Sequence, residues 1–383
     1  MSKSIALLSV TTSLALAGCV ERVDLTNETT SLRVEILAPT ELGSPDNRLA
    51  DDDRTVQVKV TALDSFGDPD LGVNVSAKVY VEFLGTLTPA LGAALPFATV
   101  PLVAGVSQPV ELSLPRVYGP TTLWIEDDTA GGSYPTGTSP ILWYQDPYLQ
   151  DISTPRDLNA LDALSSSPLQ NKQVTVTGSR HGATGRIVVT GVYAQGYTIS
   201  DVQCADEDGT PPCTTGDFDH VLVFSFSRPQ DEMGRNIAVG QFIDGFAGGV
   251  LEFNGLTEIG FPQSFVTDTS VDLARVPPPA VVQTSWFSNL IEFEKHESGL
   301  IAIEGGTVCP LDQDYATYKQ WKIDVGRGCN APINIITAGV TELDPATVVG
   351  QQLTRVTGTL RPVSIGSFNV WIMYPRFNAD IEL

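Results

Sequence analysis

Residues 56–79 read VQVKVTALDSFGDPDLGVNVSAKV, and this stretch decides the fold class. Valine recurs at every second position before the central turn, and apolar residues recur at every second position after it. Side chains of a β-strand point alternately to opposite faces, so a period of two marks a strand with one buried face. The segment GDPDLG between the two runs is a turn signal. The stretch therefore predicts two half-buried strands joined by a turn.

The same signature recurs along the chain, whereas helix signals are sparse. Short runs of Val, Ile, Thr and Phe are separated by many of the 34 glycines and 26 prolines. No long stretch has the 3.6-residue apolar period of an amphipathic helix. Hydrophobic residues make up 42% of the chain, which is enough for ordinary cores and argues against disorder. We therefore predict an all-β protein of two or three domains, beginning with a β-sandwich over residues 31–147.

The turn in the quoted stretch also carries a family resemblance. Gly67, Pro69 and Gly72 match the strand–turn–strand pattern of bacterial immunoglobulin-like domains of the invasin type, with Asp68 in place of the usual Asn. The resemblance implies that the sandwich is an Ig-like domain. Such domains usually serve as stalks or spacers.

After a predicted linker over residues 148–170, residues 171–275 carry a second resemblance. The stretch GYTISD at 196–201 and the stretch FNGLTEI at 253–259 match two elements of OB-fold domains that are appended to bacterial secreted nucleases of the ExeM type. Val239-Gly240 matches a turn of the same pattern, although Gln241 stands where Asp is usual. The resemblance implies an OB-like β-barrel. Glycines at the strand ends suit such a barrel, because its strands must bend to close the sheet.

Residues 280–383 look like a second, diverged copy of this barrel. The tripeptide VGQ at 239–241 recurs at 349–351, a spacing of about one domain, and Val-Thr-Gly recurs in both halves. We therefore predict an N-terminal Ig-like β-sandwich followed by two OB-like β-barrels, with the proline run 277–279 as a stiff hinge between the barrels. The alternative is one larger β-domain in which the repeats arise by chance.

The N-terminus resembles a bacterial lipoprotein signal. Lys3 precedes an apolar run of 13 residues, too short to span a bilayer, and the run ends in Leu-Ala-Gly-Cys at 16–19. The resemblance to a lipobox implies a signal peptide over 1–18, lipidation of Cys19 and a tether over 19–30. Val20, in place of Asp, favours the outer membrane by the same resemblance. The alternatives are an ordinary secretory signal cut elsewhere and an uncleaved anchor.

The remaining four cysteines form two local pairs. Cys204 and Cys213 are nine positions apart, and Cys309 and Cys329 are twenty apart. We predict the disulfides Cys204–Cys213 and Cys309–Cys329, consistent with an oxidising compartment. A zinc site is the alternative, but it requires CxxC-type spacing or clustered His, and neither is present.

The charge balance limits the partners. The chain has 45 acidic and 22 basic residues, a formal net charge of −23. This excess of acidic residues argues against strong, sequence-independent binding to phosphate backbones, so nucleic acid is disfavoured as a partner. It favours solubility and self-repulsion at a cell surface.

We predict no catalytic residue, no cofactor and no metal ligand. His181, His220 and His296 lie outside HxxH and HExxH spacing, and we expect all three to be surface or loop residues. No GxSxG, P-loop or Rossmann motif is present. The acidic run 206–208 resembles the start of a calcium loop without its full pattern, so a solvated turn and a calcium site both stay open.

The aromatic residues offer one possible ligand face. OB folds bind ligands on strands 2 and 3, where aromatic rings stack on bases or sugars. We assign Tyr193, Tyr197, Phe224 and Arg186 to this face. The alternative is that these rings fill the barrel core.

Taken together, these patterns predict a non-enzymatic, membrane-anchored lipoprotein at the bacterial outer membrane or cell surface. It presents its β-domains to an unknown protein or glycan partner. The alternative is an extracellular single-stranded nucleic-acid-binding or nuclease-accessory protein. A third hypothesis is a glycan hydrolase using two carboxylates, but the sequence does not place two acids across a cleft.

Overall fold

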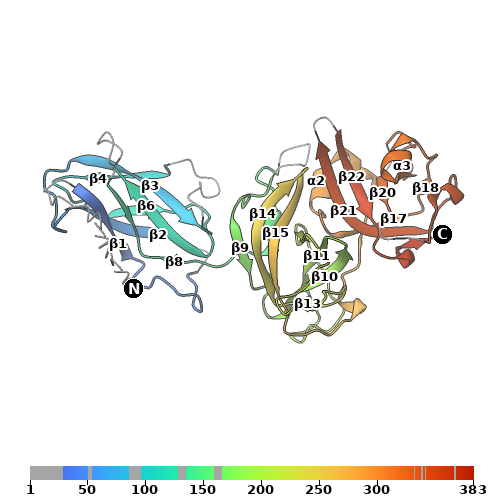
Figure 1. Ribbon diagram of the computed structural model, residues 1–383, viewed down its shortest axis with the longest axis horizontal. Helices are drawn as coiled ribbons and strands as arrows, with labels where there is room; N and C mark the ends of the chain where they lie inside the picture. The colour runs from blue at the N-terminus through green and yellow to red at the C-terminus, as the bar shows by residue number, and fades with distance from the viewer. Residues whose placement is uncertain are drawn as a thin grey trace, which may run out of the picture.

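Strands dominate every part of the chain that the computed structural model describes, which confirms the all-β prediction. The description covers residues 29–383 apart from 51–53, 86–95, 128–134, 159–165, 332, 338–339, 341 and 366–367. The proposed signal peptide and Cys19 lie outside the described residues. Figure 1 shows the described chain as three β-units in a row along the longest axis.

The first unit, which we call the sandwich, has two sheets that share one core. One sheet has the order β1-β2-β5, and the other has the order β4-β3-β6-β7 with β8 paired to β6. The quoted alternation buries Val56, Val58 and Val60 in one sheet and Val79 in the other, so the predicted turn connects the two sheets. The strands are β1 (Thr29–Ala38), β2 (Thr55–Asp64), β3 (Val75–Phe83), β4 (Ala98–Leu102), β5 (Val110–Ser113), β6 (Pro120–Glu126), β7 (Thr136–Thr138) and β8 (Leu142–Trp143).

The second unit, barrel 1, is a sheet that closes on itself. Its order is β13-β10-β11-β12-β15-β14-β9, in which β12 and β15 are parallel. One residue separates β13 from β14, and a 3₁₀ turn separates β9 from β10. Because β13 pairs with β10 and β14 pairs with β9, the two edges of the sheet are joined. The strands are β9 (Gln173–Val176), β10 (Gly185–Tyr193), β11 (Gly196–Gln203), β12 (His220–Phe224), β13 (Phe242–Ile243), β14 (Gly245–Phe253) and β15 (Leu256–Phe265).

The third unit, barrel 2, has the same connectivity. Its order is β16-β17-β21-β22-β20-β19-β18, with β23 paired to β21, and the parallel pair is β20 and β22. It has its own core, separate from that of the sandwich and barrel 1. The strands are β16 (Ala280–Val281), β17 (Leu300–Glu304), β18 (Thr307–Val308), β19 (Gln320–Asp324), β20 (Ile333–Ile336), β21 (Arg355–Ile365), β22 (Phe368–Tyr374) and β23 (Ile381–Glu382).

Helices are short and lie between strands. The α-helices are α1 (Leu149–Ser153), α2 (Ile291–Glu294) and α3 (Gln313–Tyr318). The 3₁₀ turns are η1 (Gly182–Thr184), η2 (Leu273–Arg275), η3 (Thr284–Ser288), η4 (Pro345–Thr347) and η5 (Asn378–Asp380). The predicted linker 148–170 contributes Leu149, Ile152 and Leu169 to a core that runs from the sandwich into barrel 1.

The two VGQ tripeptides make the same backbone contacts in the two barrels. In barrel 1 the Val189 N–H donates to the Gln241 carbonyl, and the Gly240 N–H donates to the Val189 carbonyl, both at 2.9 Å. In barrel 2 Val308 takes the place of Val189, with the corresponding contacts at 2.9 and 2.8 Å. The turn before β13 is thus held against β10 in barrel 1, and the turn before β21 is held against β18 in barrel 2. The Ig-like and OB-like family assignments stay predictions.

The two turn glycines provide a matched pair for a test of these turns. Both have a positive φ, +83° at Gly240 and +76° at Gly350. A Cβ at Gly240 would lie 2.5 Å from the Asp272 carbonyl oxygen, whereas a Cβ at Gly350 meets nothing within 4 Å. Gly350→Ala should therefore lower the free energy of unfolding by about 1–2 kcal/mol, the cost of a left-handed L-residue. Gly240→Ala should cost clearly more, because backbone must also move.

Urea unfolding of the two variants beside the parent protein checks this expectation. Equal losses of stability would contradict the steric argument.

Candidate functional site

A cleft between the two barrels is the site that the structure builds from both of them. It has a volume of about 470 Å³, within the range of small-molecule sites. Barrel 1 contributes Tyr193 at the end of β10 and Phe224 at the end of β12. Barrel 2 contributes Arg361 on β21, Tyr374 at the end of β22, and Arg376 just after it.

Hydrogen bonds across the junction fix the walls of the cleft. The Tyr193 hydroxyl donates to Thr359 Oγ1 at 2.6 Å, and Arg376 Nη1 donates to the Thr190 carbonyl at 2.8 Å. Arg376 also forms a bidentate ion pair with Asp380, at 3.0 Å from Nε and 2.8 Å from Nη2. The charge of Arg376 is therefore matched within the protein.

Arg361 differs from Arg376 because aromatic rings surround it in place of carboxylates. Its guanidinium carbon lies 4.3 Å from the ring centre of Tyr193 and 4.6 Å from that of Tyr374. These are cation–π distances. Its Nε and Nη2 are buried, and neither has a hydrogen-bond partner in the described part of the chain. Arg361 is thus a half-buried cation without a direct counter-ion.

Burial is the main cause of the pKa shifts of the titratable groups beside Arg361. Burial raises the pKa of Tyr374, and the Arg361 charge opposes that rise. Burial also raises the pKa of Glu258, and Arg361 again lowers it without forming an ion pair within 4 Å in the described structure. Arg361 thus interacts electrostatically with the Glu258 carboxyl but has no carboxylate within ion-pair distance in the described structure.

A strip of aromatic rings continues from the cleft along barrel 1. Phe224 contacts Phe226 with ring centres 5.2 Å apart, and Phe226 contacts Phe261 at 5.3 Å. Phe226 and Phe261 are 67% and 75% exposed, which is unusual for adjacent large apolar side chains. Phe261 lies in a bulge of β15, where Phe261 and Pro262 face Gly248 of β14, and its φ is +52°. The bulge directs Phe261 into solvent at a cost in backbone strain.

Two of the four predicted ligand-face residues meet in this cleft, Tyr193 and Phe224. Tyr197 was assigned to that face wrongly: it is 1% exposed in the barrel core, where its hydroxyl shares a hydrogen bond with Ser264. Arg186 is also misplaced, because it lies at the opposite end of β10 and donates to the carbonyls of Ala183 and Gly185. The core-filling alternative therefore holds for Tyr197.

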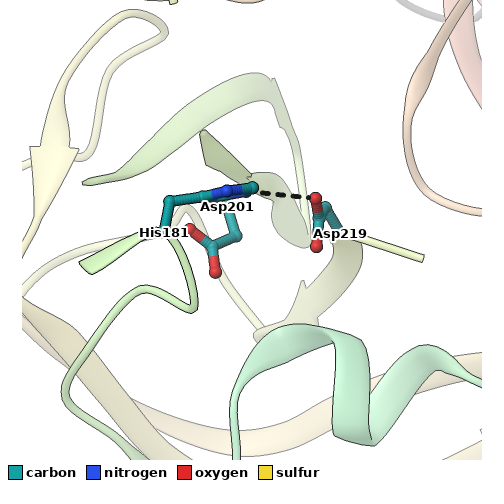
Figure 2. Close-up of side chains that lie close together, drawn as sticks. All are labelled: His181, Asp201 and Asp219. Carbon is teal, nitrogen blue, oxygen red and sulfur yellow. Dashed lines mark hydrogen bonds and ion pairs between the residues drawn. The ribbon is translucent and has the colours of Figure 1, made fainter. Parts of the chain in front are cut away.

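His181, Asp201 and Asp219 form a second polar cluster, shown in Figure 2. Asp201 lies near the end of β11 and Asp219 immediately precedes β12. His181 Nε2 is 3.4 Å from Asp219 Oδ2. Arg180 forms a bidentate ion pair with Asp219, at 2.6 Å from Nε and 2.8 Å from Nη2. The Arg180 N–H donates to Asp201 Oδ2 at 2.9 Å.

One N and two O donors within 4.8 Å of one another could in principle hold a metal ion. Arg180 already occupies both oxygens of Asp219, and the Gly216 N–H also donates to Asp219 Oδ2 at 2.8 Å. Asp201 Oδ1 is buried without a partner among the described residues. The cluster has a structural geometry. Arg180 lies between β9 and β10, and its contacts with Asp201 and Asp219 hold this segment against β11 and β12.

The expectation of surface or loop residues is wrong for His220, whereas His296 lies in the loop between α2 and β17 and is partly buried. His220 is 3% exposed, its Nδ1 lies 2.7 Å from Ser200 Oγ, and its ring lies against Gly299 of barrel 2. Burial lowers the pKa of His220 to about 3. His296 stacks on Trp286 at 4.9 Å, and burial lowers its pKa as well. Both histidines are neutral packing residues of the barrel junction.

Both predicted cysteine pairs are joined in the structure, Cys204–Cys213 and Cys309–Cys329. The first closes the loop between β11 and β12. Within it Asp206 Oδ1 accepts the N–H groups of Asp208 and Thr210 at 3.0 and 2.9 Å. The second ties the end of β18 to the loop between β19 and β20. No helix of the described residues is long and apolar enough to cross a membrane.

Comparisons with known proteins leave the family open. No family model and no curated protein matches this chain. One solved structure, described as "Ca2+-stabilized adhesin helps an Antarctic bacterium reach out and bind ice", is similar over 91% of this chain and 74% of its own. The identity is 11% and the TM-score is 0.19, too low to show a shared fold.

The cluster of His181, Asp201 and Asp219 leads to a prediction about how stability depends on pH. Burial raises the pKa of Asp201 from 3.8 to about 6, against opposing hydrogen bonds from Ser179 and Arg180. Between these values the folded protein holds a proton that the unfolded chain releases. The contribution of Asp201 to stability is thus largest below the unfolded value and falls as the pH rises to about 6. A ¹³C NMR titration of the carboxyl groups should give Asp201 a midpoint near 6.

Asp206 is the internal control, because its hydrogen bond from the Thr210 N–H lowers its pKa below 3.8. Arg180→Ala should move the Asp201 midpoint upward, since the charge of Asp219 would lose its partner. A midpoint at or below 3.8 for Asp201 would contradict the burial argument.

Proposed function

We propose that this protein is a lipid-anchored, non-enzymatic binding protein of the bacterial cell surface. In this proposal Cys19 carries the anchor and the sandwich acts as a spacer. The two barrels contact a ligand or partner. The lipobox-like stretch and the two disulfides support an exported protein.

The observation that carries the proposal is the placement of the cleft. The three β-units stand in a row (Figure 1). The residues that line the cleft come from the two units farther along the chain from Cys19. The sandwich is packed on barrel 1: Lys172 Nζ donates to the Phe83 carbonyl at 3.0 Å and lies 3.8 Å from the Phe83 ring centre. A binding site beyond a packed spacer suits presentation away from a membrane.

Single-stranded nucleic acid is the second candidate, and the exposed rings of Phe226 and Phe261 favour it. Bases stack on such rings in sequence-tolerant binding sites. The net charge of −23 opposes it, because phosphate chains are held chiefly by clustered cations.

The lipid anchor can be tested by metabolic labelling. The parent protein should incorporate a clickable fatty acid and sediment with membranes, and Cys19→Ala should do neither, because acyl transfer requires the thiol. Val20→Ala is the matched control and should remain labelled. Loss of Cys19 without loss of label would contradict the anchor.

A gel shift separates the two binding proposals. At about 50 mM salt, where electrostatic binding is strong, micromolar protein should leave a single-stranded oligonucleotide unshifted. A salt-sensitive shift that Phe226→Ala and Phe261→Ala abolish would favour the nucleic-acid candidate.

A further inference from the structure

We propose that the cleft between the barrels binds a sugar residue that carries one carboxylate, with the carboxylate facing Arg361. This inference rests on the proposed binding function and names the class of ligand at that site.

The missing partner of Arg361 is the first argument. Many arginines of the described structure form an ion pair with an aspartate: Arg48–Asp146, Arg116–Asp151, Arg180–Asp219, Arg235–Asp231, Arg275–Asp268 and Arg376–Asp380. Arg361 makes no such pair within the described structure, although the chain has twice as many acids as bases. A half-buried cation is costly without an anion or hydrogen-bond acceptors. A carboxylate that enters the cleft would supply both.

The number of charges in the cleft limits the ligand to a single anionic group. Arg376 also lines the cleft, but Asp380 neutralises it. Arg361 is therefore the one cation lining the described cleft that forms no ion pair there. A ligand with a long row of phosphates would meet one cation and the repulsion of an acidic protein.

The rings beside Arg361 indicate the rest of the ligand. The Arg361 guanidinium covers one face each of Tyr193 and Tyr374, so these rings hold the cation in place. Phe224 lines the cleft next to them, and the strip continues over Phe226 and Phe261. The C–H face of a pyranose ring packs on flat, open aromatic faces of this kind. An acidic sugar at Phe224 would let a glycan chain extend along the exposed rings.

The experiment compares two probes that differ only in the carboxylate, methyl β-D-glucuronide and methyl β-D-glucoside. Full-length protein in detergent is titrated with each probe, and binding is followed by saturation-transfer NMR and by the Arg361 Nε resonance. We expect the glucuronide to bind at least about tenfold more tightly, as one charge-assisted hydrogen bond provides. Its addition should shift the Arg361 Nε signal.

Variants assign the effect to the cleft. Arg361→Gln should remove the preference for the glucuronide, and Phe224→Leu should weaken both probes. Arg355→Gln is the matched control: Arg355 lies on the same strand with a buried Nε that is equally unpartnered in the described structure, but its backbone lies opposite Glu304 of β17 in the sheet, and it does not line the cleft. It should bind like the parent. The Arg361 Nε shift in the parent protein tests the contact even if Arg361→Gln does not fold.

Three outcomes would overturn the inference. These are equal binding of the two probes, no binding of the glucuronide at about 10 mM, or tighter binding of inorganic phosphate or of a single-stranded oligonucleotide. If fatty-acid labelling of Cys19 succeeds while the sugar test fails, the surface-lipoprotein proposal stands and the ligand assignment falls alone.

Discussion

The contacts that cross from barrel 1 to barrel 2 are the constraint on which the candidate site depends. Tyr193 reaches Thr359, Arg376 reaches the Thr190 carbonyl, and the Thr257 N–H donates to Glu297 at 2.8 Å. Neither barrel contains the cleft alone, since each supplies only part of its lining. A change that loosened this junction would remove the site without unfolding either barrel.

Much of the fold could be predicted from the sequence because its signals are local. The alternation around Val58 marks a strand whose partners need not be known, and the repeated VGQ marks a turn whose backbone contacts recur in both barrels. Tyr193 and Phe224 could be assigned to a ligand face for the same reason, since both end strands of the barrel that the motif identified.

The rest depended on contacts between distant residues. Arg361 and Tyr374 contact Tyr193 from more than 160 positions away in the sequence, and no local sequence pattern predicts that contact. Tyr197 was misassigned because all but the last residue of β11 are buried, so the alternation that separates core from surface is absent there. His220 follows an acidic loop in sequence but is covered by Gly299, a residue of the next unit.

The buried junction between the sandwich and barrel 1 bears on how far the cleft can move relative to the N-terminal end of the chain. Leu149, Ile152 and Leu169 belong to the core that runs from the sandwich into barrel 1, so these described parts of the predicted linker are packed against it. A molecule fixed at one end by a flexible chain samples many heights, which dilutes it at any one of them. In the proposed lipid-anchored arrangement, packing at this junction would narrow the range of distances between the anchor and the cleft, and the predicted tether over residues 19–30 would set the rest of that range.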